Sequence, residues 1–590
     1  MSKSLYVIFA MIFFISIPLP ASIHADTDVS TGGYLEKLLT AMDVDPGEEA
    51  AAETAIRIGL TDENTDPAAP ITIHEAAAIA IRSLNLRSPS DTPLVDARQF
   101  GLLEDETDAP LTPETMQRLL KNYRDNFERV TIVSTNDVHG RISYNPEDGE
   151  LGMAKIAAIA NRARARNDDT YVFDAGDTFH GTTAVNLGRG ETAVALMNRV
   201  PYDAMTPGNH DFNYGTERLR ELIGLASFPV LSANTVEKEN KRPFSSPYMT
   251  FDAHGKTFAV IGVTTQTTVG STDPENVKDV LFLDEIETAK RYADELRKSA
   301  DHIIVLSHSG IAKDKQIAEQ VDGIDLIVGG HSHTAIEKPL LHHGTYLTQS
   351  AGHGRAVSVA DLVFFEGDLV GMSGSLVRDH PGIEPDKAME ALVEEEKVEW
   401  AEMLDEVIAV FDQELEGGRT AVRTRQTSFG TLITDAFRVE TGAEAAFTNG
   451  GNIRAGLPEG PVTRRDLLNA LPFANTVVVL ELSGSDVEKT LEQSVSQFPG
   501  ESGGFLQVSG IDYSFNAKKP PGSRIADVRI AGEPLVPDKM YTIATNSYLA
   551  NGGNGYKWLA DLPVVLNTGE IVSGIVERYM RREGELEEGG

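Results

Sequence analysis

Five short polar motifs, each of which follows an apolar run, limit how this chain of 590 residues can fold more than any other feature. The motifs are Asn136-Asp137-Val138-His139-Gly140, Asp174-Ala175-Gly176-Asp177, Gly208-Asn209-His210-Asp211, Ser307-His308-Ser309-Gly310 and Gly330-His331-Ser332-His333. The apolar runs predict buried strands at 130–134, 171–173, 202–205, 302–306 and 325–328. Because side chains at strand ends can meet at one edge of a sheet, we expect the five motifs to converge there.

Stretches with helical spacing alternate with these strands. They lie at 153–166, 216–226 and 284–299, and this alternation predicts an α/β domain over 128–378. A strongly charged stretch follows and predicts a linker helix over 379–415 with a solvated acidic face. A second α/β domain, with glycine-rich segments, is expected over 416–586. Several domains are expected because the chain is too long for one hydrophobic core.

Charge and cysteine content exclude several classes of function. The chain has 52 Lys and Arg against 89 Asp and Glu, a formal charge of −37, which argues against general binding to a nucleic-acid polymer. An anionic substrate would need a local positive site. There is no cysteine, so a metal ion has to be held by His, Asp, Glu or Asn.

The amino terminus has the pattern of a secretory signal peptide. One lysine precedes an apolar run at 5–19, and small residues follow, so we expect cleavage after Ala25 and a signal peptide over 1–25. The alternative is an uncleaved membrane anchor, although the run is short for a spanning helix. No second apolar stretch has spanning length, so we expect a secreted or cell-surface protein without a transmembrane anchor after cleavage.

The region 26–127 contains a weak repeat of about forty residues, typical of small helical repeats. Ile58-Gly59-Leu60 and Phe100-Gly101-Leu102 are each followed by an acidic loop and a helical stretch, for which Thr72 and Thr112 are the expected N-caps. This pattern resembles the S-layer homology module, and the resemblance implies binding to cell-wall polymer. The alternative is a helical spacer without a ligand.

The polar motifs contain the residue types of a metal site. Asp137 and His139 are two residues apart and would project to the same side of an extended backbone. Asp177 has two carboxylate oxygens and can bridge two cations. The other candidate ligands are Asn209, His308, His331 and His333. This mixture of nitrogen and oxygen donors suits Zn, Mn, Co or Fe better than Ca or Mg.

In this order, the motifs resemble those of the calcineurin-like metallophosphoesterases, and specifically the 5'-nucleotidase branch, which also contains UDP-sugar hydrolases and 2',3'-cyclic phosphodiesterases. The resemblance spans 128–579 and implies a four-layer αββα sandwich followed by a 5'-nucleotidase C-terminal domain. It also implies two divalent cations. One would be held by Asp137, His139, Asp177 and His333, and the other by Asp177, Asn209, His308 and His331.

The same resemblance implies that His210 contacts the substrate phosphate. Relatives of the 5'-nucleotidase type commonly have Gly-Asn-His-Glu-Phe-Asp, in which the final Asp orients the histidine, whereas this chain has Asn213 at that position. Asparagine cannot supply the charge that would raise the pKa of an imidazole. Phe212-Asn213-Tyr214-Gly215 is closer to the cyclic phosphodiesterases. Asp211 is an alternative partner for His210, but a loop or cap role suits it better.

The second domain is expected to bind the nucleotide. Its Asn449-Gly450-Gly451-Asn452-Ile453-Arg454 segment resembles a phosphate-binding segment of the family, and Arg423 matches a second phosphate-binding arginine. Two further segments resemble those that enclose the base, so Phe473 and Tyr548 would stack on its two faces. Asn554 stands where relatives usually have an aspartate for a ribose hydroxyl.

These features lead to one main hypothesis and three alternatives. The main hypothesis is an exported two-metal 5'-nucleotidase that releases phosphate from nucleoside 5'-monophosphates. The first alternative is a 2',3'-cyclic-nucleotide 2'-phosphodiesterase and 3'-nucleotidase, and the second is a UDP-sugar hydrolase. The third, from a different class, is a non-catalytic cell-wall-binding protein.

Overall fold

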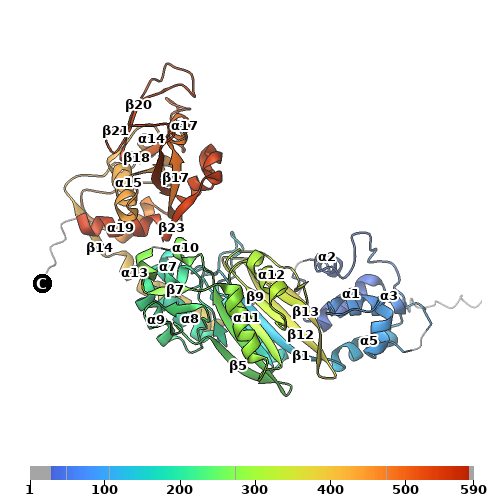
Figure 1. Ribbon diagram of the computed structural model, residues 1–590. Helices are drawn as coiled ribbons and strands as arrows, with labels where there is room; N and C mark the ends of the chain where they lie inside the picture. The colour runs from blue at the N-terminus through green and yellow to red at the C-terminus, as the bar shows by residue number, and fades with distance from the viewer. Residues whose placement is uncertain are drawn as a thin grey trace, which may run out of the picture.

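The computed structural model describes residues 28–583, apart from 45, 48, 105, 106, 273 and 474. The predicted signal peptide, 1–25, lies outside the described residues. Figure 1 shows three successive parts: a small group of helices near the amino terminus in blue, a central α/β part in green and yellow, and a carboxyl-terminal α/β part in orange and red. The central part lies between the other two.

The amino-terminal part is helical, as the repeat pattern predicted, and its described residues form five helices. They are α1 (Thr31–Ala41), α2 (Ala51–Arg57), α3 (Ile73–Ser83), α4 (Pro93–Gln99) and α5 (Pro113–Asp125). Thr72 accepts a hydrogen bond from the Glu75 backbone N–H, and Thr112 accepts one from Thr115, so both predicted N-caps are confirmed. The helices share an apolar core that includes Val363 of the central part, and this core holds the two parts together.

Two mixed sheets form the centre of the molecule. The first has the order β13 (Asp368–Arg378), β12 (Ala356–Phe365), β1 (Glu128–Thr135), β2 (Thr170–Asp174) and β3 (Ala204–Met205). The second has the order β10 (Leu340–His342), β11 (Thr345–Thr348), β9 (Leu326–Gly329), β8 (His302–His308), β6 (Lys256–Thr264) and β5 (Tyr248–Ala253). The five strands predicted before the polar motifs are β1, β2, β3, β8 and β9.

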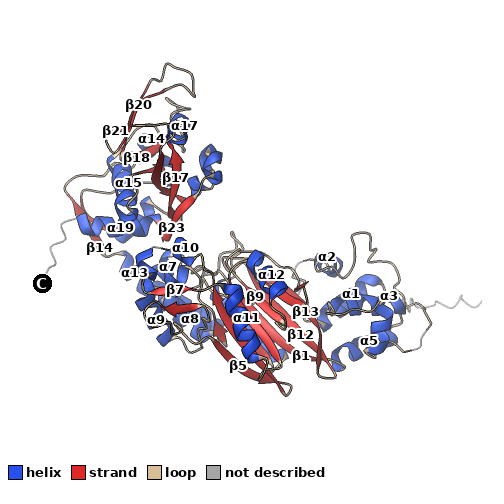
Figure 2. Ribbon diagram, viewed as in Figure 1, coloured by secondary structure: helices blue, strands red, loops and turns tan. Residues whose placement is uncertain are grey.

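Alternation of side chains along the strands produces four layers. Ile304 and Leu306 of β8 point into the core between the two sheets, whereas Ile303 and Val305 point into the outer core beneath the helices. Helices α11 (Glu285–Leu296) and α12 (Ile311–Gln320) cover the second sheet, and α6 (Gly152–Arg166), α8 (Glu191–Arg199) and α9 (Gly215–Leu225) cover the first. Figure 2 shows α8, α9, α11 and α12 outside the strands. The predicted αββα sandwich is therefore confirmed.

The linker is shorter and less exposed than the charge pattern predicted. Helix α13 spans Lys387–Leu404, and β14 (Val407–Phe411) follows and pairs with β16 (Gly460–Thr463) of the carboxyl-terminal part. Met389 and Val393 are buried in the core of the first sheet's helices. The helix therefore does not extend over 379–415, because its first turns pack on the central part and its end gives way to a paired strand.

The carboxyl-terminal part has one five-stranded sheet between helices. Its strand order is β18 (Leu506–Ser509), β15 (Ala445–Asn449), β22 (Met540–Asn546), β17 (Thr476–Ser483) and β23 (Val564–Ile571). Helices α15 (Ser428–Thr441) and α19 (Val572–Glu583) pack on one face, and α17 (Gly484–Ser494) packs on the other. This is the second α/β domain that the sequence predicted. Across the described residues, each helix is too short or too polar to cross a membrane.

Candidate functional site

The polar motifs converge at the carboxyl ends of the parallel strands of both central sheets. His308, at the end of β8, donates from Nδ1 to the backbone oxygen of Ala175, which follows β2, over 2.6 Å. The His331 backbone N–H donates to Oδ2 of Asp137 over 2.9 Å. These two contacts join the sheets at the edge where the motifs meet. The first also leaves Nε2 of His308 as the ring atom that faces Asp177.

Two groups of potential metal ligands form at this edge. Asp137, His139 and His333 make up the first group, and Asp177, His308 and His331 make up the second, with the ligand atoms of each group within 4.8 Å of one another. Oδ2 of Asp177 lies 3.1 Å from Nε2 of His308 and 3.9 Å from Nε2 of His139. Its carboxylate therefore lies between the two groups, where a bridging ligand is expected.

The backbone at these ligands differs from the extended conformation that we assumed for Asp137 and His139. Five of the seven predicted ligands have a left-handed φ: Asp137 (+50°), His139 (+47°), Asp177 (+58°), His331 (+71°) and His333 (+51°). Such φ values cost about 1–3 kcal/mol each and persist where surrounding contacts impose them. The Asp137 and His139 N–H groups donate to the backbone oxygens of Gly176 and Asp177, each over 2.8 Å, so the loops hold one another in place.

Asp211 has a structural role in these loops. Its carboxylate accepts backbone N–H groups of Gly208, Asp177, Thr178 and Phe179 over 2.8–3.1 Å. It therefore holds the second and third motifs together, and the loop role that we expected is confirmed. Gly208 is required beside it, because a Cβ there would lie 2.1 Å from Oδ1 of Asp177.

The site has the properties of a cation-binding centre. Oδ1 of Asn209 is buried and has no hydrogen-bond partner among the described residues, as expected for an oxygen that ligates a cation. Burial would raise the pKa of Asp177, but His308, His210 and His139 hold it well below its usual range. Burial would lower the pKa of His308, but Asp177 and Asp137 raise it to about 10. The carboxylates thus create a strongly negative potential, and the donor set fits two divalent cations.

The structure brings Asn213 against the predicted catalytic histidine. Nδ2 of Asn213 lies 3.2 Å from Nδ1 of His210 and 3.2 Å from Nδ1 of His180. The His210 backbone N–H donates to Oδ1 of Asp177 over 2.8 Å. His210 is therefore oriented by a neutral amide through its ring and by the Asp177 carboxylate through its backbone.

Two histidines at this edge were missed in the sequence. His180 is buried, and its ring lies nearly parallel to that of His210, with ring centroids 6.0 Å apart. His353 has its ring centroid 5.3 Å from that of His139 and 5.0 Å from that of His333. His180 comes three residues after Asp177, and His353 stands between two glycines after a strand. Their proximity to the motifs was the signal that could have identified them.

The six predicted nucleotide contacts line one cavity of about 490 Å³ in the carboxyl-terminal part. They are Arg423, Asn449, Arg454, Phe473, Tyr548 and Asn554. The Phe473 and Tyr548 side chains are 42% and 44% exposed, so neither is a core residue. Nε of Arg423 is buried without a hydrogen-bond partner among the described residues. Burial and the neighbouring cations Arg419 and Arg454 lower the pKa of Arg423, which shows that positive charge gathers at this cavity.

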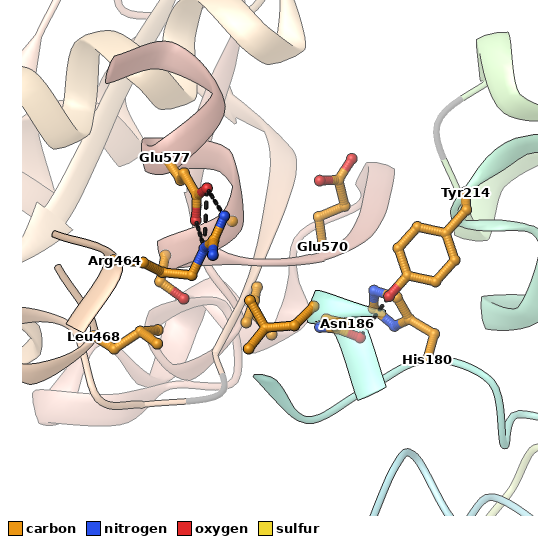
Figure 3. A pocket seen from close by; sticks show the side chains of 11 residues that line it. His180, Asn186, Tyr214, Arg464, Leu468, Glu570 and Glu577 are labelled. Atoms are coloured by element: carbon orange, nitrogen blue, oxygen red, sulfur yellow. Dashed lines mark hydrogen bonds and ion pairs between the residues drawn. The ribbon is translucent and has the colours of Figure 1, made fainter. Parts of the chain in front are cut away.

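The metal ligands do not line this cavity. Strand β23 instead contacts the catalytic edge, where the Gly569 backbone oxygen accepts a hydrogen bond from Nδ2 of Asn213 over 3.2 Å. Beside this contact is an interdomain cavity of about 180 Å³, shown in Figure 3, with His180 and Tyr214 on the central side and Arg464 and Glu570 on the other. In this domain arrangement the cavity of the carboxyl-terminal part and the metal ligands are separate.

Comparison with known proteins places these features in a family. Residues 130–335 match the model of the calcineurin-like phosphoesterases, and residues 407–561 match that of the 5'-nucleotidase C-terminal domain. A 5'-nucleotidase from Diplobatis ommata is 33% identical over 77% of this chain and 87% of its own length. The chain belongs to the 5'-nucleotidase family. The chain is therefore a metal-dependent hydrolase of phosphoric esters.

Two further relatives of the 5'-nucleotidase family support the assignment. The trifunctional nucleotide phosphoesterase protein YfkN from Bacillus subtilis is 31% identical over 73% of this chain, although the match covers only 32% of that longer relative. The crystal structure of a 5'-nucleotidase precursor from Thermus thermophilus is 31% identical, with a TM-score of 0.50, and covers 77% of this chain and 96% of its own. Divalent cations are therefore the expected cofactors of this chain.

Proposed function

We propose that this member of the family releases phosphate from nucleoside 5'-monophosphates with the help of two divalent cations. The observation that carries the proposal is the composition of the cavity in the carboxyl-terminal part. Two arginines and two half-exposed aromatic side chains line a single space of about 490 Å³. Guanidinium groups suit a phosphate, and aromatic faces suit a base, so the lining matches a nucleotide.

In this proposal, Asp137, His139, Asp177 and His333 hold one cation, and Asp177, Asn209, His308 and His331 hold the other. Two such cations lower the pKa of water and neutralise phosphoryl oxygens during an in-line displacement. The protein contributes the fixed positions of these ligands. His210 faces the same edge and is the side chain that we assign to the phosphate, with Asn213 as its positioning residue.

Hydrolysis then requires a second arrangement of the domains, because the nucleotide cavity contains none of the metal ligands. The chain has no cysteine, so Leu225→Cys and Val536→Cys would give a unique dye pair across the two α/β parts. These side chains are 48% and 51% exposed, and labelling should leave the fold intact. We expect energy transfer between the dyes to change during turnover. An unchanged transfer efficiency in an active, labelled enzyme would contradict the second arrangement.

One observation favours a different phosphoester. Asn213 supplies a neutral amide to His210, where relatives of the 5'-nucleotidase type commonly have a carboxylate. Because of Asn213, 2',3'-cyclic nucleotides and nucleoside 3'-monophosphates are the second candidate substrates.

A substrate panel distinguishes the two candidates. Phosphate release is measured from 5'-AMP, 3'-AMP, 2',3'-cyclic AMP and a UDP-hexose at saturating manganese. Release from 5'-AMP but not from 3'-AMP supports the main proposal, and the reverse result overturns it. Hydrolysis of the UDP-hexose alone would assign the chain to the UDP-sugar hydrolases.

Export and attachment to the cell wall remain predictions from the sequence. Detection of chains that begin after Ala25 in the culture medium would establish export. Sedimentation of the full chain with purified cell-wall polymer would establish attachment through 26–127. Recovery of the whole protein from the cell interior with its first 25 residues present would contradict the signal peptide.

A further inference from the structure

A second group of metal-ligand side chains lies outside the catalytic edge. Glu319 in the last turn of α12, His342 at the end of β10 and His343 in the following turn have ligand atoms within 4.8 Å of one another. We call these three residues the peripheral histidine cluster. Nε2 of His342 lies 2.9 Å from Oε1 of Glu319, and the two imidazole centroids are 4.8 Å apart. Glu319 and His343 are exposed, and His342 is half-buried, so an ion can reach all three from solvent.

The turn that carries the histidines is tight and defined. In the β10–β11 hairpin His342 pairs with Thr345, so the loop contains only His343 and Gly344, with φ values of +49° and +84°. Two consecutive left-handed residues define a type I′ turn, whose first position normally holds Asn, Asp or Gly. An imidazole occupies that position here and is held next to the imidazole of His342. The hairpin therefore presents two nitrogen donors in a preorganised pair.

The chemistry of the cluster suits zinc or a similar ion. Two imidazoles and one carboxylate form a known zinc ligand set that leaves the fourth position to water. Zinc–ligand distances of about 2.0–2.2 Å place tetrahedral ligand atoms about 3.3 Å apart, close to the contact between His342 and Glu319. Calcium and magnesium prefer oxygen ligands and do not suit this set. His342 is the one ion-pair partner of Glu319 within the described part of the chain.

The peripheral cluster is separate from the catalytic edge. β11 runs parallel to β9, and its first residue lies next to the turn, at the opposite end of the sheet from the metal-binding loops. A strand of four residues is about 13 Å long, so a full strand length separates the cluster from that edge. No ion can be shared between the two places.

We propose that the peripheral histidine cluster is a third divalent-cation site, specific for zinc-like ions, that fastens the end of α12 to the β10–β11 hairpin. Both elements lead to the catalytic edge. α12 begins three residues after His308, and β11 ends directly before Gln349, whose Nε2 donates to the Gly330 backbone oxygen over 2.9 Å. A cation at the cluster thus stabilises the two elements that support the ligands of the second catalytic cation.

The test counts zinc ions on the purified full-length chain by elemental analysis after equilibration and gel filtration. His343→Asn is the first variant, because asparagine favours the left-handed turn and removes only the imidazole. His342→Ala combined with Glu319→Gln is the second variant. We expect each variant to bind one zinc fewer per chain than the unmodified protein, and zinc to raise the melting temperature of the variants less than that of the unmodified protein.

The chain contains a matched control. His254 and Gly255 form the two-residue turn between β5 and β6, with φ values of +49° and +71°, and His254 lies 3.2 Å from Asp169. This turn has the same histidine and carboxylate but no second imidazole. His254→Ala should therefore keep the full zinc count.

Equal zinc counts in the unmodified protein and both variants overturn the proposal, as does the absence of a zinc anomalous peak beside His342 in crystals of the unmodified protein. The result is independent of the proposed catalytic function. Loss of the catalytic cations would lower the counts of all proteins together and would leave the difference of one ion unchanged.

Discussion

Removal of the Phe473 side chain tests the nucleotide cavity most directly. The ring is 42% exposed, and the guanidinium carbon of Arg454 lies 5.7 Å from its centroid. Phe473→Ala therefore opens no sealed cavity in the core. We expect the free energy of unfolding to change by less than about 1 kcal/mol. Any large kinetic effect then reports on substrate binding.

The magnitude follows from base stacking. One aromatic platform contributes about 1–3 kcal/mol per base. At 1.4 kcal/mol per tenfold, this corresponds to a rise in KM of about 5- to 140-fold for the nucleotide. Because stacking acts on the ground state and the transition state alike, kcat should stay within about twofold. Tyr548→Ala should behave similarly, and it also removes the hydroxyl that accepts from the Asn554 N–H over 3.2 Å. Tyr548→Phe separates these two contributions.

The assay is steady-state phosphate release from 5'-AMP at saturating metal. Tyr144→Ala is a matched control, because Tyr144 is 48% exposed and has a lysine 4.0 Å from its ring centroid but lies outside the cavity. Its KM should equal that of the unmodified protein. A KM within twofold of that value in both Phe473→Ala and Tyr548→Ala would refute the assignment of these rings to the base.

Three further predictions concern the catalytic edge and the contact between the first two parts. Asp177→Asn should abolish turnover and lower the content of bound metal, while the circular dichroism spectrum stays unchanged. Exhaustive chelation of the unmodified protein should also abolish turnover until manganese is restored. Activity that survives chelation would exclude metal dependence. Asn213→Ala should lower kcat about 10- to 100-fold with little change in KM, because a displaced His210 loses its alignment; an unchanged kcat contradicts this positioning role. Burial would raise the pKa of Asp325, but His302 and Arg87 hold it below its usual value. The ionised carboxylate therefore contributes fully to the free energy of unfolding above the unfolded-state pKa of about 3.9, and this contribution is lost as the pH falls through the lower folded-state pKa. Urea denaturation of Asp325→Asn should therefore show a loss of about 2–3 kcal/mol at pH 7 that shrinks below about pH 4, whereas a loss that is independent of pH contradicts the ion pair.

The sequence was sufficient for the fold class and for the general composition of the site. The predicted ligands lie at, or a few residues beyond, the ends of strands with apolar runs: His308 is the last residue of β8, and His331 follows the end of β9. Such patterns can be recognised in the sequence because burial of a strand in a sheet requires apolar side chains at particular positions of that strand. The same holds for the N-caps Thr72 and Thr112, since a cap depends only on the first turn of its own helix.

Interactions between residues that are distant in the sequence could not be predicted from such local patterns. Asp137 and His139 reach one cation position through left-handed backbone, because the loop after β2 imposes that conformation. The carboxylate of Asp211 is a loop anchor because four backbone N–H groups happen to surround it. The ring of His353 contacts that of His139, which lies more than two hundred residues earlier in the chain. Strand patterns carry no information about any of these contacts.

The chain alone thus determined that two sheets present histidines, carboxylates and one asparagine amide at their strand ends, and that a later domain carries arginines and aromatic rings. Only the tertiary structure decided that Asn213 also contacts His180, that strand β23 covers Asn213 through Gly569, and that the cavity lined by the arginines and aromatic rings lies elsewhere. The physical reason is the sequence separation of the residues that interact. Secondary structure follows from the periodicity of neighbouring residues, whereas a site between loops and domains depends on packing among residues that are far apart in the chain.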